Sequence, residues 1–184
     1  EHLHQAGVTA IRSVGDVPAN ILRLRNLVEI GEMEGPDVFC AGPVFTTPGG
    51  HPASTTFGAD EALRLEATRE VVEVEAARWA VAALAREGVD GIHIEYHDWA
   101  GTFSRLPEAV LRALVDQAKT EGLWTAVSTG NAAEAEEAIA AGATTVERGS
   151  FLSIDSLTVP KQAFMLIPTL GAYRDSLEYT AMKA

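Results

Sequence analysis

The residues best suited to chemistry lie close together near the middle of the chain. His93 and Glu95 alternate with isoleucines, so a β-strand here directs an imidazole and a carboxylate to one face, near enough to bind one metal ion. A histidine hydrogen-bonded in a polar interior would show the same pattern. His97 lies roughly 13 Å from His93 along an extended strand, so we do not expect all three residues to bind one ion. His2 and His4 fall on a predicted helix, where residues two apart point in different directions, and are not expected ligands.

Three further residues are candidates for substrate binding. His51 lies in a long, glycine-rich loop without periodicity after a predicted strand, the usual profile of a binding loop. Tyr96 can hydrogen-bond a ligand, or its ring can pack under a helix. Arg148 ends another predicted strand, where its guanidinium can clamp an anionic group of a ligand or form a structural ion pair, with Glu95 as the obvious partner.

The elements that position these residues repeat one pattern: a helix, a glycine, a strand and a polar residue at the end of the strand. We predict strands at about 8–14, 38–42, 88–97, 124–128, 144–148 and 164–169. We predict helices at about 18–33, 61–87 (perhaps in two pieces), 107–120, 132–141 and 155–162, and a loop at 43–58. Alternating strands and helices favour a parallel sheet, either a barrel or a doubly wound sheet.

In both architectures, functional residues lie at the carboxyl ends of the strands. Counting forward from the glycine before each strand identifies five residues at a similar position along their strands. We expect them to lie together at the carboxyl-end opening of the sheet or barrel, called the mouth: Ser13, Ala41, His93, Ser128 and Arg148. The sequence has neither a GxGxxG motif after the first strand nor a Walker A motif, which disfavours nucleotide binding. It also lacks the GxSxG motif that would mark a serine as a nucleophile.

The composition restricts the partners of the protein. The 184 residues carry a formal net charge of -12, which disfavours nucleic acid and anionic membranes as partners. No apolar run approaches the roughly 18 residues of a membrane-spanning helix. Cys40 is the only cysteine, so the chain can form neither an internal disulfide nor a cysteine metal cluster, and we expect a reducing, cytoplasmic compartment.

Several stretches, taken in order, resemble the amidohydrolase superfamily, specifically its imidazolonepropionase-like and prolidase-like metal-dependent hydrolases. The resemblance rests on residues 6–12, 35–42, 48–51, 88–96, 128–130, 141–149 and 168–170. It implies a (β/α)8 barrel with a zinc or other divalent metal centre. The metal ligands of that family are an HxH motif on the first strand, a carboxylated lysine on the fourth, histidines on the fifth and sixth, and an aspartate on the eighth.

The resemblance places three residues of this chain at ligand positions of the family. His93 stands at the lysine position, Ser128 at that of the fifth-strand histidine and Arg148 at that of the sixth-strand histidine. Neither a serine nor an arginine is expected to bind a metal cation here. His93 and Glu95 therefore remain the metal-ligand candidates.

The resemblance also implies which part of a barrel the chain covers and which reaction we expect. A full barrel typically needs about 250 residues, so we expect residues 1–184 to be one incomplete α/β domain, an internal segment of a (β/α)8 TIM barrel with strands two to seven. Its unpaired strand edges could mediate homo-oligomerisation. The expected activity is hydrolysis of an amide, cyclic amide or dipeptide-like C–N bond in a small molecule with an amide or carboxylate. The alternative is an inactive relative whose mouth, formed by His93, Glu95 and Arg148, binds an anionic small molecule or a partner.

Overall fold

The described part of the chain alternates short parallel strands with helices. The computed structural model describes residues 3, 6–57, 59–148 and 164–168. The strands are β1 (Ala10–Ser13), β2 (Asp37–Cys40), β3 (Val44–Thr46), β4 (Thr68–Glu70), β5 (Gly91–Glu95), β6 (Trp124–Ser128), β7 (Thr145–Glu147) and β8 (Met165–Ile167). The helices are α2 (Pro18–Glu29), α3 (Glu61–Ala67), α4 (Val74–Glu87), α5 (Glu108–Thr120) and α6 (Ala132–Ala141). The helix expected at 155–162 lies outside the described residues.

The strands pair in the order β4-β3-β5-β6-β7-β8, and β1 pairs with β2. All the pairs are parallel, as predicted. Strand β2 also lies beside the start of β5, because the Asp90 N–H donates to the Cys40 carbonyl at 2.8 Å and the Cys40 N–H donates to the Asp90 carboxylate at 2.9 Å. Because β3 also pairs with β5, β2 and β3 lie one after the other along β5.

The sheet curves around an interior that its strands share. Arg12 on β1 reaches β7, where one guanidinium nitrogen lies 2.6 Å from Glu147 Oε1 and the other donates to Thr145 Oγ1 at 3.1 Å. The same guanidinium lies 5.1 Å from the centre of the Trp124 ring on β6. Strands β1 and β7 are not paired in the sheet, so their side chains meet across the interior. This curvature favours a barrel over an open, doubly wound sheet.

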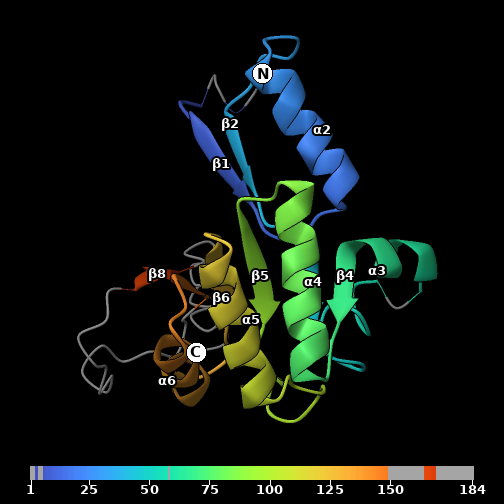
Figure 1. Ribbon diagram of the computed structural model, residues 1–184, viewed down its shortest axis with the longest axis vertical. Helices are drawn as coiled ribbons and strands as arrows, with labels where there is room; N and C mark the ends of the chain where they lie inside the picture. The colour runs from blue at the N-terminus through green and yellow to red at the C-terminus, as the bar shows by residue number, and fades with distance from the viewer. Residues whose placement is uncertain (1–2, 4–5, 58, 149–163, 169–184) are drawn as a thin grey trace, which may run out of the picture.

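The two faces of the central strands have the predicted opposite characters. Ile92 and Ile94 of β5 are fully buried in the main hydrophobic core, together with Val127 of β6 and Val146 of β7. Helices α4, α5 and α6 cover that face, and α4 and α5 pack side by side in front of β5 (Figure 1). The opposite face carries the buried polar residues His93, Glu95, Ser128 and Glu147. The alternation in the sequence therefore correctly assigns the chemical face of β5.

The boundaries of the helices follow local signals in the sequence. Asn131 caps α6, since its side-chain oxygen accepts a hydrogen bond from the Glu134 N–H at 3.0 Å, as expected for a residue of its type before a helix. Gly88 ends α4 and Gly142 ends α6 in the left-handed region, with φ of 91° and 94°, where glycine is favoured because it has no Cβ. These caps fix the points at which the chain turns towards β5 and β7.

Two strands lie where the sequence predicted other structures. Strand β3 falls in the predicted loop 43–58, and β4 interrupts the predicted helix 61–87. The residues of β4 pair with β3, and the Val71 N–H donates to the Thr46 carbonyl at 2.8 Å just beyond it. The loop prediction was therefore wrong at β3 and the helical prediction was wrong at β4, because pairing with a distant segment overrides the local preference. The division of 61–87 into two helices, α3 and α4, is confirmed.

None of the helices in the described part of the chain combines the length and the apolarity that a membrane-spanning segment requires.

Candidate functional site

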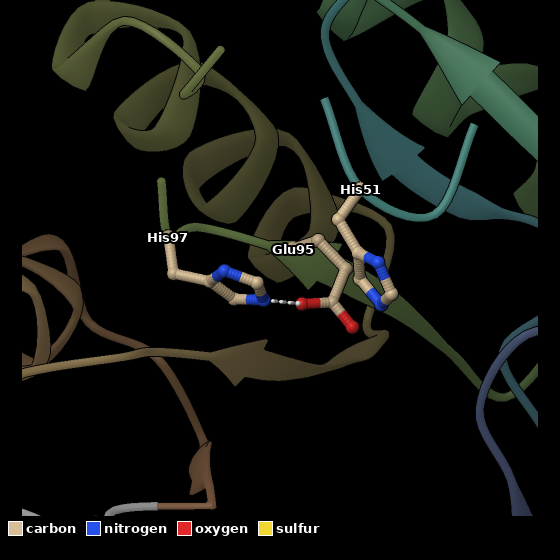
Figure 2. Close-up of side chains that lie close together, drawn as sticks. All are labelled: His51, Glu95 and His97. Atoms are coloured by element: carbon tan, nitrogen blue, oxygen red, sulfur yellow. Dashed lines mark ion pairs between the residues drawn. The ribbon is translucent and has the colours of Figure 1, made fainter. Parts of the chain in front are cut away.

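A carboxylate and two imidazoles meet at the carboxyl end of β5. The strand ends at Glu95, and the chain then turns so that His97 Nε2 lies 2.7 Å from Glu95 Oε2. The predicted strand continued to residue 97, which kept His97 far from the other two residues. That prediction was wrong, because the early end of β5 brings His97 back over the mouth of the barrel (Figure 2).

The second imidazole comes from the loop after β3. Thr46 Oγ1 donates to the His51 carbonyl at 2.7 Å, and the Gly50 N–H donates to the Thr47 carbonyl at 2.8 Å. A Cβ at Gly50 would lie 2.6 Å from Thr46 Oγ1 and 2.9 Å from the Thr47 carbonyl oxygen, so the loop closes this tightly only with glycine. The turn directs His51 towards β5, and the Glu95 carboxylate lies between the two imidazole rings (Figure 2).

The site contains buried polar atoms that lack hydrogen-bond partners among the described residues. These atoms are Glu95 Oε2, both ring nitrogens of His97, His93 Nδ1 and Thr129 Oγ1. The 2.7 Å contact between His97 and Glu95 lacks the alignment of a hydrogen bond, so it does not satisfy either atom. Because a buried polar atom without a partner is costly, their convergence at the mouth indicates a place built to receive a ligand.

The electrostatics of the site favour an ionised carboxylate at Glu95 and neutral imidazoles at His51 and His93. Burial acts to raise the pKa of Glu95, but His97, His93 and Arg148 together outweigh burial and hold this pKa below its ordinary value. Burial lowers the pKa of His51 and that of His93, although Glu95 acts in the opposite direction on both. At neutral pH, Glu95 is therefore a carboxylate and His51 and His93 are mainly neutral.

Arg148 forms the predicted ion pair with Glu95. Its Nη2 lies 3.4 Å from Glu95 Oε1. Strand β7 ends at Glu147, and Arg148 has a left-handed φ of 68°, which is uncommon for a residue with a side chain. The turn sends Arg148 to the Glu95 side of the mouth, while Glu147 pairs with Arg12 across the interior.

The expected common depth of five strand-end residues was wrong between β5 and β6. The pairing sets Ser128 opposite Glu95, and His93 opposite Ala126. The error has two parts of one residue each: β5 begins three residues after Gly88, whereas β6 begins two after Gly122, and His93 is the fifth residue after its glycine, whereas Ser128 is the sixth after its own. Ser128 nevertheless contacts His93, since both lie on the inner face and Ser128 Oγ lies 2.9 Å from His93 Nε2.

The three positions that the resemblance assigns to metal ligands do not fit a metal ion. Nε2 of His93 already contacts the Ser128 hydroxyl, and Arg148 brings a positive charge to the third position. His93 also lies outside the one group of metal-binding residue types that comes together in the described part of the chain, namely His51, Glu95 and His97. The role of His93 as a metal ligand stays a prediction that this arrangement does not favour.

Tyr96 lies on the helix side of β5. Its side chain is fully buried in the main core, its hydroxyl donates to Glu137 on α6, and its ring lies 4.8 Å from the guanidinium carbon of Arg105. The ring therefore packs under a helix, which is one of the two alternatives that the sequence offered for Tyr96. Its role in substrate binding stays a prediction without support from this placement.

An aromatic wall, formed by Trp99 and Phe103, borders the two imidazoles. The Trp99 ring stacks at 5.4 Å from the His97 ring and at 5.7 Å from the His51 ring, and the Phe103 ring lies 5.9 Å from that of Trp99. Neither residue was among the candidates from the sequence. Two aromatic residues directly after a strand that carries histidines were the available signal. The wall gives the charged mouth an apolar side, suited to an uncharged part of a ligand.

Comparisons with known proteins find the fold of this chain in other solved structures. No family model matches the chain, and no curated protein matches it by sequence. Solved structures do match, including a Xaa-Pro dipeptidase with bound methionine in its active site, at 24% identity and a TM-score of 0.75, over 94% of this chain and 45% of the other. An amidohydrolase matches at 23% identity and a TM-score of 0.77, over 98% and 47%. The ochratoxinase of A. niger matches at 17% identity and a TM-score of 0.78, over 96% and 45%.

The chain thus spans less than half the length of each of these neighbours. At these identities the likeness is one of fold, and it extends over nearly the whole chain. At the level of the fold, the comparisons agree with the resemblance seen in the sequence: the chain has the partial (β/α)8 barrel fold of these structures.

Proposed function

We propose that this chain forms one side of the active site of a hydrolase that cleaves an amide, cyclic amide or dipeptide-like C–N bond. One observation carries the proposal: the buried, ionised Glu95 lies between two imidazoles at the carboxyl end of the barrel strands. Active sites of (β/α)8 enzymes are built at this end of the barrel. The dipeptidase and the ochratoxinase with which the chain shares its fold are named as hydrolytic enzymes.

Each residue at the mouth has a task in such a reaction. Glu95 can take a proton from an attacking water, because its carboxylate is ionised and its Oε2 lacks a hydrogen-bond partner among the described residues. Arg148, whose side chain is 37% exposed, can hold a carboxylate of the substrate at the rim. The aromatic wall can pack against an apolar group of the substrate. A divalent ion, where one is bound, would polarise the carbonyl and make the water more acidic.

The ion pair of Arg148 favours a second function, the binding of an anionic small molecule without hydrolysis. Arg148 supplies a positive charge at the mouth, where the resemblance expects a metal-binding histidine. In this case the site would hold a carboxylate or a similar group, and Glu95 would only position the arginine.

A hydrolysis assay separates the two functions. Purified protein containing residues 1–184 is incubated with zinc and a panel of N-acyl amino acids, cyclic amides and dipeptides, and the released amine is measured. We expect hydrolysis of at least one class, and a loss of kcat/KM of about 100-fold or more in Glu95→Gln, which keeps the shape but removes the base. Glu108→Gln is the matched control, since Glu108 is exposed and pairs with its exposed helix neighbour Arg112.

Full activity in Glu95→Gln would refute the proposed role of Glu95. No hydrolysis above that of buffer for any class would reject the hydrolase. Carboxylate binding that is lost in Arg148→Gln, without hydrolysis, would establish the second function instead.

A further inference from the structure

We propose that His51, Glu95 and His97 form a binding site for one divalent metal ion, made of two imidazoles and one carboxylate. This site differs from the three positions that the resemblance assigns to metal ligands, which do not fit an ion here. The inference deepens the proposed function by naming a cofactor class and its ligands. Where the ion is bound, Glu95 would be one of its ligands rather than the base, and the ion would make the water more acidic in its place. It rests on that function for the role of the ion, but the binding itself is tested without any hydrolysis.

The geometry of the three side chains suits one ion. One ligand atom from each residue lies within 4.8 Å of the other two. Ligand atoms around a tetrahedral zinc ion lie about 3.3–3.6 Å apart, given metal–ligand distances of about 2.0–2.2 Å. Binding would therefore draw the most distant ligand atoms together and separate Glu95 Oε2 from His97 Nε2, which lie 2.7 Å apart. His51 is partly exposed and lies in a loop, so it is the residue that can move most easily.

Two of the three ligands are buried with unpartnered atoms directed into the site. Glu95 is 5% exposed and His97 is 2% exposed. Glu95 Oε2 and His97 Nε2 lie 2.7 Å apart without forming a hydrogen bond. A cation placed between them and His51 would supply the partner that these atoms lack. Gly130 supports this arrangement, because a Cβ there would lie 3.2 Å from His97 Cβ, so the backbone packs directly against the histidine.

The hydrogen bonds of His51 leave the correct nitrogen available. Thr55 Oγ1 lies 2.7 Å from His51 Nδ1 and can donate its single proton to the Pro52 carbonyl at 3.4 Å. With its proton placed there, the hydroxyl oxygen accepts from Nδ1–H and the lone pair of His51 Nε2 is available to an ion, so binding of the ion selects this tautomer. Histidine ligands in metal sites are commonly oriented by such a partner.

The charges around the site determine its affinity. Glu95 divides its carboxylate: Oε2 faces His97, and Oε1 faces Arg148 at 3.4 Å. The guanidinium repels a cation and competes with it for Glu95, so Arg148→Gln should bind the ion more tightly than the unchanged protein. Three protein ligands of the His, His and Glu types leave a coordination position open, as in catalytic zinc sites.

Zinc titration by calorimetry and the visible absorption of bound cobalt test the site. The protein used contains residues 1–184 with His2→Gln and His4→Gln, because these two histidines lie outside the described residues and could bind zinc themselves. We expect one zinc ion per chain, released by a chelator. His51→Gln and His97→Gln should each lower the affinity about 100-fold or more, and Thr55→Val about 10-fold. Glu108→Gln, which changes an exposed carboxylate paired with Arg112, is the matched control and should bind as before.

Several outcomes would overturn the proposal: no zinc binding, unchanged binding in His51→Gln, or an equal loss of binding in the control Glu108→Gln. Circular dichroism monitors the fold of each variant. If the buried His97→Gln does not fold, His51→Gln still decides, since His51 lies in a partly exposed loop. Zinc binding without hydrolysis would support this site and reject the hydrolase. Hydrolysis by a protein that binds no zinc would reject this site and support the hydrolase.

Discussion

Gly91 and Trp124, at the starts of β5 and β6, allow a direct test of the packing inside the barrel. Gly91 on β5 pairs with Trp124 on β6, and a Cβ at Gly91 would lie 2.1, 2.3 and 2.4 Å from three atoms of the Trp124 ring. Gly91→Ala therefore forces the indole to move. Overpacking of a core costs about 1–3 kcal/mol, and the displaced indole would also lose its contact with the Arg12 guanidinium at 5.1 Å, worth about 0.5–1 kcal/mol. We expect a loss of about 2–4 kcal/mol in the free energy of unfolding.

Urea denaturation followed by circular dichroism measures this loss. The matched control is the double variant Gly91→Ala/Trp124→Leu, in which the smaller side chain makes room for the methyl group. The cost of Gly91→Ala should fall below about 1 kcal/mol in that background, so the double-mutant cycle gives the coupling directly. A cost of less than about 0.5 kcal/mol in the presence of Trp124 would refute the close packing, as would an equal cost in both backgrounds.

Two further predictions concern Cys40 and the ion pair between Arg12 and Glu147. Burial, followed by the Asp90 carboxylate, raises the pKa of the Cys40 thiol from 9.0 to about 11, so alkylation by iodoacetamide at pH 8 should be much slower in the folded than in the unfolded protein. The raised pKa also means that the protonated thiol stabilises the folded protein, and this contribution to the free energy of unfolding is complete below pH 9.0 and declines as the pH rises to about 11. Cys40→Ala should lack this decline. An identical pH profile of stability in the variant and the unchanged protein would contradict the assignment. Arg12→Met should lower the free energy of unfolding by about 1–3 kcal/mol, because Glu147 loses its charged partner. Adding Glu147→Gln should recover part of that loss in urea denaturation, and a simple sum of the two single effects would show that the residues do not interact.

The sequence predicts well what depends on local patterns. The alternation around His93 and Glu95 correctly assigned the two faces of β5, because the period of two is a property of the strand itself. The pairing of Arg148 with Glu95 was also predicted correctly, since a charge near the interior needs a counter-charge, and few candidates of opposite sign lie at neighbouring strand ends.

The errors arise where distant segments decide the structure. Strand β4 exists because it pairs with β3, and the helical composition of its surroundings gives no sign of that. His97 was placed too far away because the end of β5 depends on the turn that follows it. The meeting of His51 with His97 requires a loop and a strand end separated by more than 40 residues to converge, which no local period can indicate.

The two oxygens of Glu95 face different groups, and this couples the binding of an anion to the binding of a cation. An anion that draws Arg148 away from Oε1 leaves more negative charge on Glu95 for a cation near Oε2. The converse follows by linkage, since each ligand must change the affinity of the other by the same factor. A carboxylate-bearing substrate and a metal ion would then assist each other's binding, and the mouth of the barrel would hold both more tightly together than either alone.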